Sequence, residues 1–348
     1  MEILSYCFVD ENSNVISSKY ENLNILPASN MKLLTGYALY SILGRDYTLR
    51  TVFNINRDKI HVSGDPTPLL TLEDLYKISE NLRGKQKINS VEFEKIFDNN
   101  YYGRGWSMDD VKFCYSQKIE PYTVNEGCIY DNYMPESHEF HSPHDNNMFP
   151  CNAHRKLFSD FLIYNVNNSN NSINENIIYE MDIKKILKHI EVMSCNFSAE
   201  VMFKYLSYIK NGTGTSSESS KIIKNFIEKF YGRNDLYIAD GSGLSRLNLV
   251  NTLFLSEFVN RIYRQNDEFL QLLPDSRTGN GTLKNRFTDI KNHTIRAKTG
   301  TLDHCSLLSG IIEDKNISFS ISINNSNLSE NERELKIDKL LKHRIDKL

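Results

Sequence analysis

No apolar run in the 348-residue sequence approaches the ~20 residues needed to span a bilayer, so we expect no transmembrane segment. An excess of basic charge is also missing, since 41 Lys and Arg stand against 44 Asp and Glu for a net charge of −3. Proteins that grip nucleic acid usually carry a basic excess, so nucleic acid is not an expected partner. The first residues lack the basic, apolar and small-residue segments of a secretory signal, which predicts a cytoplasmic chain.

Paired cysteine motifs are absent as well. The six cysteines are scattered and none forms a C-x-x-C pair, so we expect reduced thiols rather than a disulfide framework. His138, His141 and His144 lie three residues apart, and Cys151 and His154 follow in a C-x-x-H arrangement. These residue types bind zinc, but the usual ligand spacings are missing. The sequence therefore favours a polar surface loop and predicts no metal and no cofactor.

The remaining composition is that of a folded protein. Apolar residues make up 40% and charged residues 24%, and the length suits about two domains. Residues 3–9 and 15–16 are apolar around a turn-rich stretch, which predicts a β-hairpin. Apolar residues alternate with serines over 317–323, the pattern of a half-buried strand. Further strands are expected over 294–298 and 305–312.

Helical signals fill the space between these ends. From Ser29 an apolar residue recurs every four positions, at Leu34, Ala38 and Ile42, and Gly44 is expected to end this helix. The other expected elements are helices over 182–210 and 221–231, loops over 165–176 and 212–220, and a C-terminal amphipathic helix that carries Leu335, Leu340, Leu341 and Ile345.

Strands at both termini with helices between them predict an α/β (α+β) fold. One antiparallel sheet would be assembled from the two ends of the chain and flanked by helices. We expect residues 1–53 and 182–348 to form this domain, and residues 54–181 to form a smaller inserted domain.

Three short motifs occur in a fixed order. Residues 29–32 read Ser-Asn-Met-Lys, an S-x-x-K at a helix start; residues 194–196 read Ser-Cys-Asn, an S-x-N; and residues 298–300 read Lys-Thr-Gly at the end of an expected strand. Each alone has an ordinary explanation, such as a solvated pair, a helix cap or a strand exit. The trio together is typical of penicillin-binding proteins and class A β-lactamases.

The chemistry explains the spacing. Residues three apart share a helix face, so the Lys32 amine can lie beside the Ser29 hydroxyl. A serine is a weak nucleophile until a base removes its proton. Lys32 can be that base if burial and the nearby cation Lys298 lower its pKa. Gly300 lets the strand backbone come close to a substrate.

The surrounding residues make the likeness specific. Residues 26–35, Leu-Pro-Ala-Ser-Asn-Met-Lys-Leu-Leu-Thr, resemble the active-site serine segment of the D-alanyl-D-alanine carboxypeptidases of peptidase family S13, the class C low-molecular-mass penicillin-binding proteins. Residues 240–246, Asp-Gly-Ser-Gly-Leu-Ser-Arg, resemble a signature of that family. Residues 272–302 resemble the family's C-terminal segment, and residues 64–67 and 105–110 resemble parts of its inserted domain. The likeness covers most of the chain.

This resemblance implies roles for the motif residues. Ser29 would be the acylated nucleophile and Lys32 the base for acylation. Ser194 would relay a proton to the leaving amine, and Asn196 would orient the substrate amide. Lys298 would supply positive charge.

The resemblance also implies how a substrate is held. Thr299 and Thr301 would bind the terminal carboxylate of a peptide that ends in D-Ala-D-Ala, beside Gly300. The backbone N–H groups of Ser29 and Thr301 would form the oxyanion hole. β-Lactams would act as covalent inhibitors at the same serine.

Three further residues match positions that border the family's cleft, namely Trp106, Asp109 and Arg246. An aromatic face and a carboxylate would suit a substrate side chain that ends in an amine. An equally weighted interpretation places Trp106 in the core, where it holds the insertion on the main domain.

Two departures from the family and two alternatives remain at this point. The insertion is shorter than is typical, and the family acts on peptidoglycan outside the membrane, whereas this sequence shows no export signal. One alternative is another serine hydrolase of the same fold, such as a β-lactamase or a D-amino-acid peptidase. The other is a non-enzymatic sensor that forms a stable acyl adduct with β-lactams.

Overall fold

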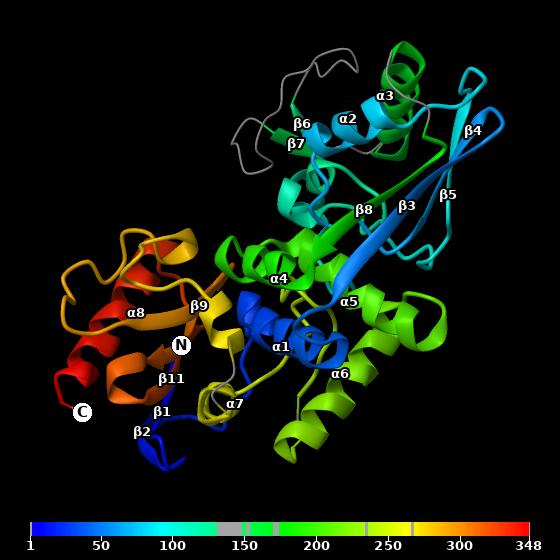
Figure 1. Ribbon diagram of the computed structural model, residues 1–348. Helices are drawn as coiled ribbons and strands as arrows, with labels where there is room; N and C mark the ends of the chain where they lie inside the picture. Colours follow the sequence, from blue (N-terminus) through cyan, green and yellow to red (C-terminus); the bar gives the residue numbers. More distant parts are fainter. Residues whose placement is uncertain are drawn as a thin grey trace.

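The computed structural model describes residues 2–130, 148–150, 154–169, 174–233, 236–265 and 268–347 (Figure 1). Its main sheet has five strands in the order β2-β1-β11-β10-β9. These strands are β1 (Ile3–Val9), β2 (Val15–Lys19), β9 (Ile295–Leu302), β10 (Cys305–Ile312) and β11 (Ile317–Asn324). Because β1 pairs antiparallel with both β2 and β11, the expected hairpin and the sheet built from both chain ends are confirmed.

Strand β11 is buried on both faces, so the expectation of a half-buried strand is wrong. Its isoleucines and Phe319 pack in a cluster with helix α8 (Glu330–Ile345). The serine face lies toward helix α7 (Thr252–Arg264), since Ser5 on the neighbouring strand bonds Thr252 over 2.8 Å. Small hydroxyl side chains let a helix pack closely against the sheet. They can also hydrogen-bond to one another, as Ser309 and Ser320 do over 2.8 Å.

Helix α8 closes the outer face of the sheet. Ser329 and Glu332 form a capping box at its start, which satisfies the first free backbone N–H groups. Its buried stripe is Ile337, Leu341 and Ile345, at a four-residue spacing. The expected stripe is therefore wrong in part, because Leu335 is half exposed.

Helix α7 packs against β1, β10 and β11 on the other face of the sheet, and a group of helices lies between this sheet and the insertion (Figure 1). This group contains α1 (Met31–Leu43), α4 (Ile183–Val192), α5 (Asn196–Asn211) and α6 (Ser216–Tyr231). Helix α1 is buried on all sides over Met31–Tyr40 because α4, α5 and α6 all pack around it, so no single apolar face marks it. The expected loop over 212–220 ends early, since Thr215 caps α6 at its start.

The segment between α1 and α4 carries a second sheet in the order β5-β4-β3-β8. Its strands are β3 (Thr48–Asn56), β4 (Lys59–Gly64), β5 (Ser90–Phe93) and β8 (Asn176–Asp182), with helices α2 (Leu72–Asn81) and α3 (His154–Asn168) and the short pair β6 (Cys128–Tyr130) and β7 (Met148–Pro150). The expected loop over 165–176 is wrong at its start, since α3 continues to Asn168. The division into two domains stays a prediction.

Single 3-10 turns connect these elements at η1 (Ala28–Asn30), η2 (Met108–Lys112), η3 (Cys114–Ser116), η4 (Asn125–Gly127), η5 (Glu268–Leu272), η6 (Gly281–Leu283) and η7 (Glu313–Lys315). In the part of the chain that the structure describes, no helix has the length and apolar character to cross a membrane. His138, His141, His144 and Cys151 lie outside the described residues, and His154 begins α3.

Candidate active site

Ser29 lies in the turn η1 that leads into α1. The chain reaches it through Ala28, whose φ of +45° is in the left-handed region. Gly243, with φ +87°, faces this turn, and a Cβ on it would come within 1.8 Å of the Ala28 carbonyl oxygen. The glycine of the Asp-Gly-Ser-Gly-Leu segment is thus required both by its backbone angle and by the close approach of the serine turn.

Lys32 lies one turn after Ser29, and its amine has three partners. Nζ is 2.9 Å from Ser29 Oγ, 2.6 Å from Asn196 Oδ1 and 2.7 Å from the Ser242 carbonyl oxygen. A neutral amine has two N–H donors and one lone pair. An ammonium would donate to all three oxygens, whereas a neutral amine would donate to the two carbonyl oxygens and turn its lone pair toward the Ser29 hydroxyl.

Burial prepares Lys32 for proton transfer. The side chain is 0% exposed, and this loss of hydration lowers the pKa of Lys32 from its usual value to about 8. At neutral pH a useful fraction of the amine is then unprotonated, which a solvated lysine would not offer.

A second serine–lysine pair faces the first. Ser194 has φ +57° and lies just before α5, where Cys195 caps the helix. Lys298 Nζ is 2.8 Å from Ser194 Oγ and 3.1 Å from the Thr299 carbonyl oxygen. Lys298 is also 0% exposed, and burial together with the charge of Lys32 lowers its pKa.

Strand β9 runs along the site as the edge strand of the main sheet. Lys298, Thr299 and Gly300 lie in its middle rather than at its end, because pairing with β10 continues to Leu302. A Cβ on Gly300 would lie 2.9 Å from the Pro27 carbonyl oxygen and 3.1 Å from Ser29 N. The glycine therefore lets the strand reach the serine turn.

These elements enclose a cavity of about 540 Å³. It is lined by Ser29, Asp110, Tyr115, Asn196, Gly243, Leu244, Arg246, Thr301, Leu302, Asp303, His304, Asn327, Leu328, Glu330 and Arg333. The cavity brings together Ser29, Asn196 from the second motif, Thr301 next to the Lys-Thr-Gly segment, and Arg246. Lys32 contacts two of these lining residues, Ser29 and Asn196, while Ser194, Lys298, Thr299 and Gly300 are not part of the lining.

Arg246 organises one wall of this cavity. It donates to Asp110 over 3.0 Å and to Asp303 over 3.2 Å. Asp110 also accepts from the hydroxyl of Tyr115. Asp109, which the sequence predicts at the cleft, is exposed and does not line the cavity. Its neighbour Asp110 lines the cavity instead.

Trp106 does not line the cavity either. Its indole N–H donates over 2.9 Å to Asp240, a fully buried carboxylate that also accepts from the backbone N–H groups of Gly243 and Ser245. Trp106 thus ties the inserted segment to the loop behind Ser29.

Trp106→Phe is expected to remove this hydrogen bond and to cost about 1–3 kcal/mol of folding stability, since one donor to a buried carboxylate is lost. Thermal unfolding checks this cost. Phe113→Leu, at an exposed ring on the same segment, is the control and should leave the unfolding temperature unchanged. An unchanged unfolding temperature in Trp106→Phe would contradict the anchoring role.

Sequence reasoning missed several residues of the cavity. The adjacent pair at 109 and 110 gave no sign of which carboxylate turns inward, because a 3-10 turn has no simple periodicity. Tyr115 contributes its carbonyl oxygen, which accepts from Asn196 Nδ2 over 3.0 Å, and a backbone acceptor leaves no mark in a sequence.

A mixed cluster lies behind the second motif. Glu126, His189 and Cys195 have side-chain atoms within 4.8 Å of one another. Glu126 and His189 are hydrogen-bonded, and Cys195 Sγ accepts from Ser198 N over 3.3 Å at the helix cap. The Glu126–His189 bond joins the insertion to α4, whereas the Cys195–Ser198 bond lies at the start of α5, and we assign no metal to the cluster.

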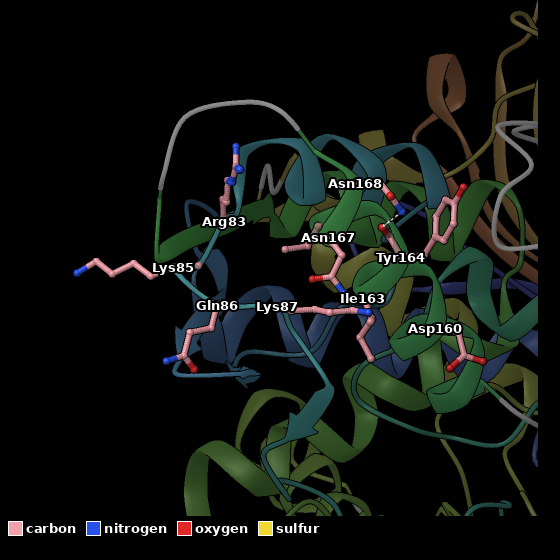
Figure 2. A pocket seen from close by; sticks show the side chains of 11 residues that line it. Arg83, Lys85, Gln86, Lys87, Asp160, Ile163, Tyr164, Asn167 and Asn168 are labelled. Carbon is pink, nitrogen blue, oxygen red and sulfur yellow. Dashed lines mark hydrogen bonds between the residues drawn. The ribbon is translucent and has the colours of Figure 1, made fainter.

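Another cavity, of about 750 Å³, lies in the insertion (Figure 2). Its lining includes the basic residues Arg83, Lys85 and Lys87. Figure 2 shows Lys85 directed away from the other side chains, and Asn168 donating to the Tyr164 carbonyl oxygen within helix α3. The charges do not converge, and none of the motif residues lies here.

The comparisons with known proteins agree with this fold. Penicillin binding protein 4 (dacB) from Haemophilus influenzae is similar with a TM-score of 0.80 and 17% identity, over 99% of this chain and 96% of that chain. Bd3459, a predatory peptidoglycan endopeptidase from Bdellovibrio bacteriovorus, is similar with a TM-score of 0.64 and 15% identity, over 100% and 93%. A penicillin G acylated form of Bd3459, in complex with immunity protein Bd3460, gives 0.62 and 16%, over 100% and 93%.

No curated protein sequence matches the chain significantly. The family model described as the D-Ala-D-Ala carboxypeptidase 3 (S13) family matches residues 9–156 and 179–344, which is nearly the whole chain. The fold, the ordered motifs and this match lead to one conclusion: the chain belongs to the D-Ala-D-Ala carboxypeptidase 3 (S13) family and is a serine peptidase.

Proposed function

We propose that the protein is a D-Ala-D-Ala carboxypeptidase that acts through an acyl-enzyme on Ser29. The observation that carries the proposal is a set of two serine–lysine contacts linked through residues 194–196. Ser29 and Lys32 lie 2.9 Å apart, Ser194 and Lys298 lie 2.8 Å apart, and Asn196 bonds Lys32 over 2.6 Å. One pair supplies a nucleophile with its base, and the other supplies a proton for the leaving group.

Acylation would follow from this geometry. The Lys32 lone pair takes the Ser29 proton while Oγ attacks the carbonyl carbon of the penultimate D-alanine. The negative charge that develops on the carbonyl oxygen is received by the backbone N–H groups of Ser29 and Thr301. Ser194 passes its proton to the departing D-alanine nitrogen and regains one from Lys298, and Lys32 returns the serine proton to this pair. Free D-alanine leaves, and the peptide stays esterified to Ser29.

Substrate binding would use the open edge of β9. An extended peptide can pair with the free N–H and C=O groups of an edge strand. The terminal carboxylate would then lie near Lys298, Thr299 and Thr301, which offer one positive charge and two hydroxyl donors. Water hydrolyses the ester in the second half of the reaction, with Lys32 again as the base.

A β-lactam would acylate Ser29 in the same way, but the reaction would stop at the acyl-enzyme. Its ring amide acylates Ser29, but the leaving nitrogen stays attached to the adduct and continues to occupy the leaving-group side of the site. The acyl-enzyme should therefore persist. The penicillin G acylated form of Bd3459 supports this expectation for the present chain.

The direct test is incubation with fluorescent penicillin and with diacetyl-Lys-D-Ala-D-Ala. We expect a covalent label on Ser29, located by mass spectrometry, and release of one D-alanine per peptide. Release of D-alanine with turnover excludes a sensor without catalysis. The absence of both label and D-alanine would refute the proposed function.

The cavity wall points to a preference among peptides. The cavity lining contains three carboxylates, Asp110, Asp303 and Glu330, and two guanidinium groups, Arg246 and Arg333, so it carries one more negative than positive side chain of these types. We therefore compare peptides in which the residue before D-Ala-D-Ala has a side chain that ends in an amine. The peptide with the free amine should bind better than the peptide with the acetylated amine.

Asp110→Asn is expected to reduce this preference several-fold, because it removes one carboxylate from a partly dehydrated wall. Asp109→Asn is the matched control, since that side chain is exposed and outside the cavity. The measurement is kcat/KM for the free and acetylated peptides with each variant. Equal losses for both peptides in Asp110→Asn would contradict the charge preference.

A further inference from the structure

Helix α1 holds both carbonyl oxygens of a short stretch of backbone, residues 241–242. Lys32 Nζ donates to the Ser242 carbonyl oxygen over 2.7 Å, and Thr35 Oγ1 donates to the Gly241 carbonyl oxygen over 2.8 Å. Lys32 and Thr35 are three residues apart and therefore share a face of the helix. The position of this backbone thus bears directly on the amine that the proposed mechanism uses as a base.

Glu200 on α5 holds the N–H groups of the same stretch. Its Oε1 accepts from Gly241 N over 2.9 Å and from Ser242 N over 2.7 Å. The Glu200 side chain is 0% exposed, and its Oε2 has no hydrogen-bond partner among the described residues. Burial of a carboxyl group costs free energy that its contacts must offset. The contacts of Glu200 go to the backbone that carries the Ser242 carbonyl, so its effect is expected there.

The two peptide groups that flank the Ser242 side chain are both fixed. The peptide before it donates to Glu200, and the peptide after it donates through Gly243 N to Asp240 Oδ1 over 3.0 Å. The Ser242 carbonyl can turn away from Lys32 only if one of these peptides rotates. Loss of the acceptor at 200 would free the first of them.

Helix α5 therefore reaches Lys32 by two routes. Asn196 lies four residues before Glu200 on the same helix face, and its Oδ1 accepts directly from Lys32 Nζ over 2.6 Å. Glu200 acts on the second acceptor, the Ser242 carbonyl oxygen. A neutral Lys32 amine needs both acceptors for its N–H groups if its lone pair is to face Ser29.

We propose that Glu200 is a positioning residue that fixes the Ser242 carbonyl against Lys32 and so aims the amine at Ser29. The contacts run without a gap from Glu200 Oε1 to Ser242, from the Ser242 carbonyl to Lys32 Nζ, and from Nζ to Ser29 Oγ over 2.9 Å. Glu200 is not among the residues that line the cavity, so it acts on the amine and not on a substrate. The inference rests on the proposed function for the role of Lys32 as the base.

The test is the kinetics of labelling by fluorescent penicillin, which separate reversible binding (Kd) from the acylation step (k2). Glu200→Met keeps an unbranched side chain of similar length but removes the acceptor oxygen. We expect k2 to fall by roughly 10²-fold, the cost of an ångström-scale misplacement of a reacting group. Kd should change little, because position 200 lies outside the cavity lining. An unchanged k2, or a loss that appears only in Kd, would overturn the inference.

Glu200→Gln is the conservative variant that should restore the rate. Its amide oxygen can accept from the same two N–H groups. Burial raises the pKa of Glu200 to about 8, so the loss of its charge is a small change near neutral pH. We expect k2 to stay close to that of the wild type. A loss in Glu200→Gln as large as that in Glu200→Met would show that the charge matters and not the backbone contacts, which also overturns the inference.

Glu200→Asp keeps the acid but shortens its reach by one methylene. It should lower k2 in the same direction as Glu200→Met, and it carries the test if the methionine variant does not fold. A wild-type k2 in Glu200→Asp would contradict the need for contact with the backbone.

Ser207→Ala is the matched control for a weakened α5. Ser207 is also 0% exposed on this helix, and its Oγ accepts from Thr215 N over 2.6 Å. The substitution therefore removes a buried acceptor of a backbone N–H, as Glu200→Met does, but away from residues 241–242. It should lower the unfolding temperature and leave k2 unchanged. An equal fall of k2 in both variants would mean that lost stability lowers the rate, and the inference would fail.

A second measurement separates this inference from the proposed function. The ¹⁵Nζ shift of Lys32 follows its protonation by NMR without any substrate. The Ser242 carbonyl stabilises the ammonium form, so the pKa of Lys32 should be lower in Glu200→Met than in Glu200→Gln, two variants that both lack the charge. This difference supports the inference even if penicillin does not label the wild type, in which case only the proposed function fails. Labelling of the wild type with the same Lys32 titration in both variants overturns the inference alone.

Discussion

Ser29→Ala is expected to abolish covalent labelling by penicillin and release of D-alanine. The substitution removes the hydroxyl that lies 2.9 Å from the Lys32 amine, and Ser29 is the one serine among the described residues that line the cavity. Folding should be nearly unaffected, because a half-buried hydroxyl at a turn contributes little to the core. Intact-protein mass spectrometry after incubation with penicillin measures the effect, and thermal unfolding measures the stability.

The matched control is Ser216→Ala, which removes a hydroxyl at the first residue of helix α6, away from the cavity. It should label like the wild type. A label in Ser29→Ala that maps to another side chain would refute the assignment of the nucleophile.

Lys32→Arg is expected to lower the acylation rate by ~10²–10⁴, the range in which a positioned general base contributes. Arginine keeps the positive charge but does not give up its proton at working pH, so it cannot accept the proton of Ser29. The larger guanidinium must also fit a space that is closed on all sides. The measurement is the second-order rate of labelling by penicillin.

Lys204→Arg is the buried control for this substitution. Lys204 is 0% exposed on α5 and pairs with Asp98, away from the cavity. It should lower thermal stability but keep most of the acylation rate. Retention of most of the rate in Lys32→Arg would instead show that Lys32 acts only as a fixed charge.

The sequence predicts the chemistry of this site better than its walls. Ser29, Lys32 and Lys298 belong to motifs whose spacing follows from helix and strand geometry. Their arrangement in the structure agrees with the prediction made from these motifs. Asp110 belongs to no motif, and its place in the cavity wall depends on the rotation of a 3-10 turn.

The same division applies to the fold. Local patterns predict β1, β2 and β10 because a strand shows its own periodicity. They also predict β11, but they miss its burial on both faces, because its serines face helix α7 rather than water and a local pattern does not show which helix packs on a strand. They also fail at residues 165–168, where asparagines that favour loops are held in α3 by its buried phenylalanines, Phe158 and Phe161.

The pairing of β1 with β11 has a consequence for how the enzyme is made. Ile3 lies opposite Asn324, so the central strands of the sheet cannot pair until the ribosome has synthesised the chain as far as β11. Contacts of such long sequence separation form slowly, since a large loop must close first. Ser29 emerges early, but Lys298 and the edge strand that would receive a peptide emerge some 270 residues later. The nascent chain therefore carries its nucleophile without the rest of the site, and reactivity toward an acylating compound should arise only after β9 and β11 have been synthesised.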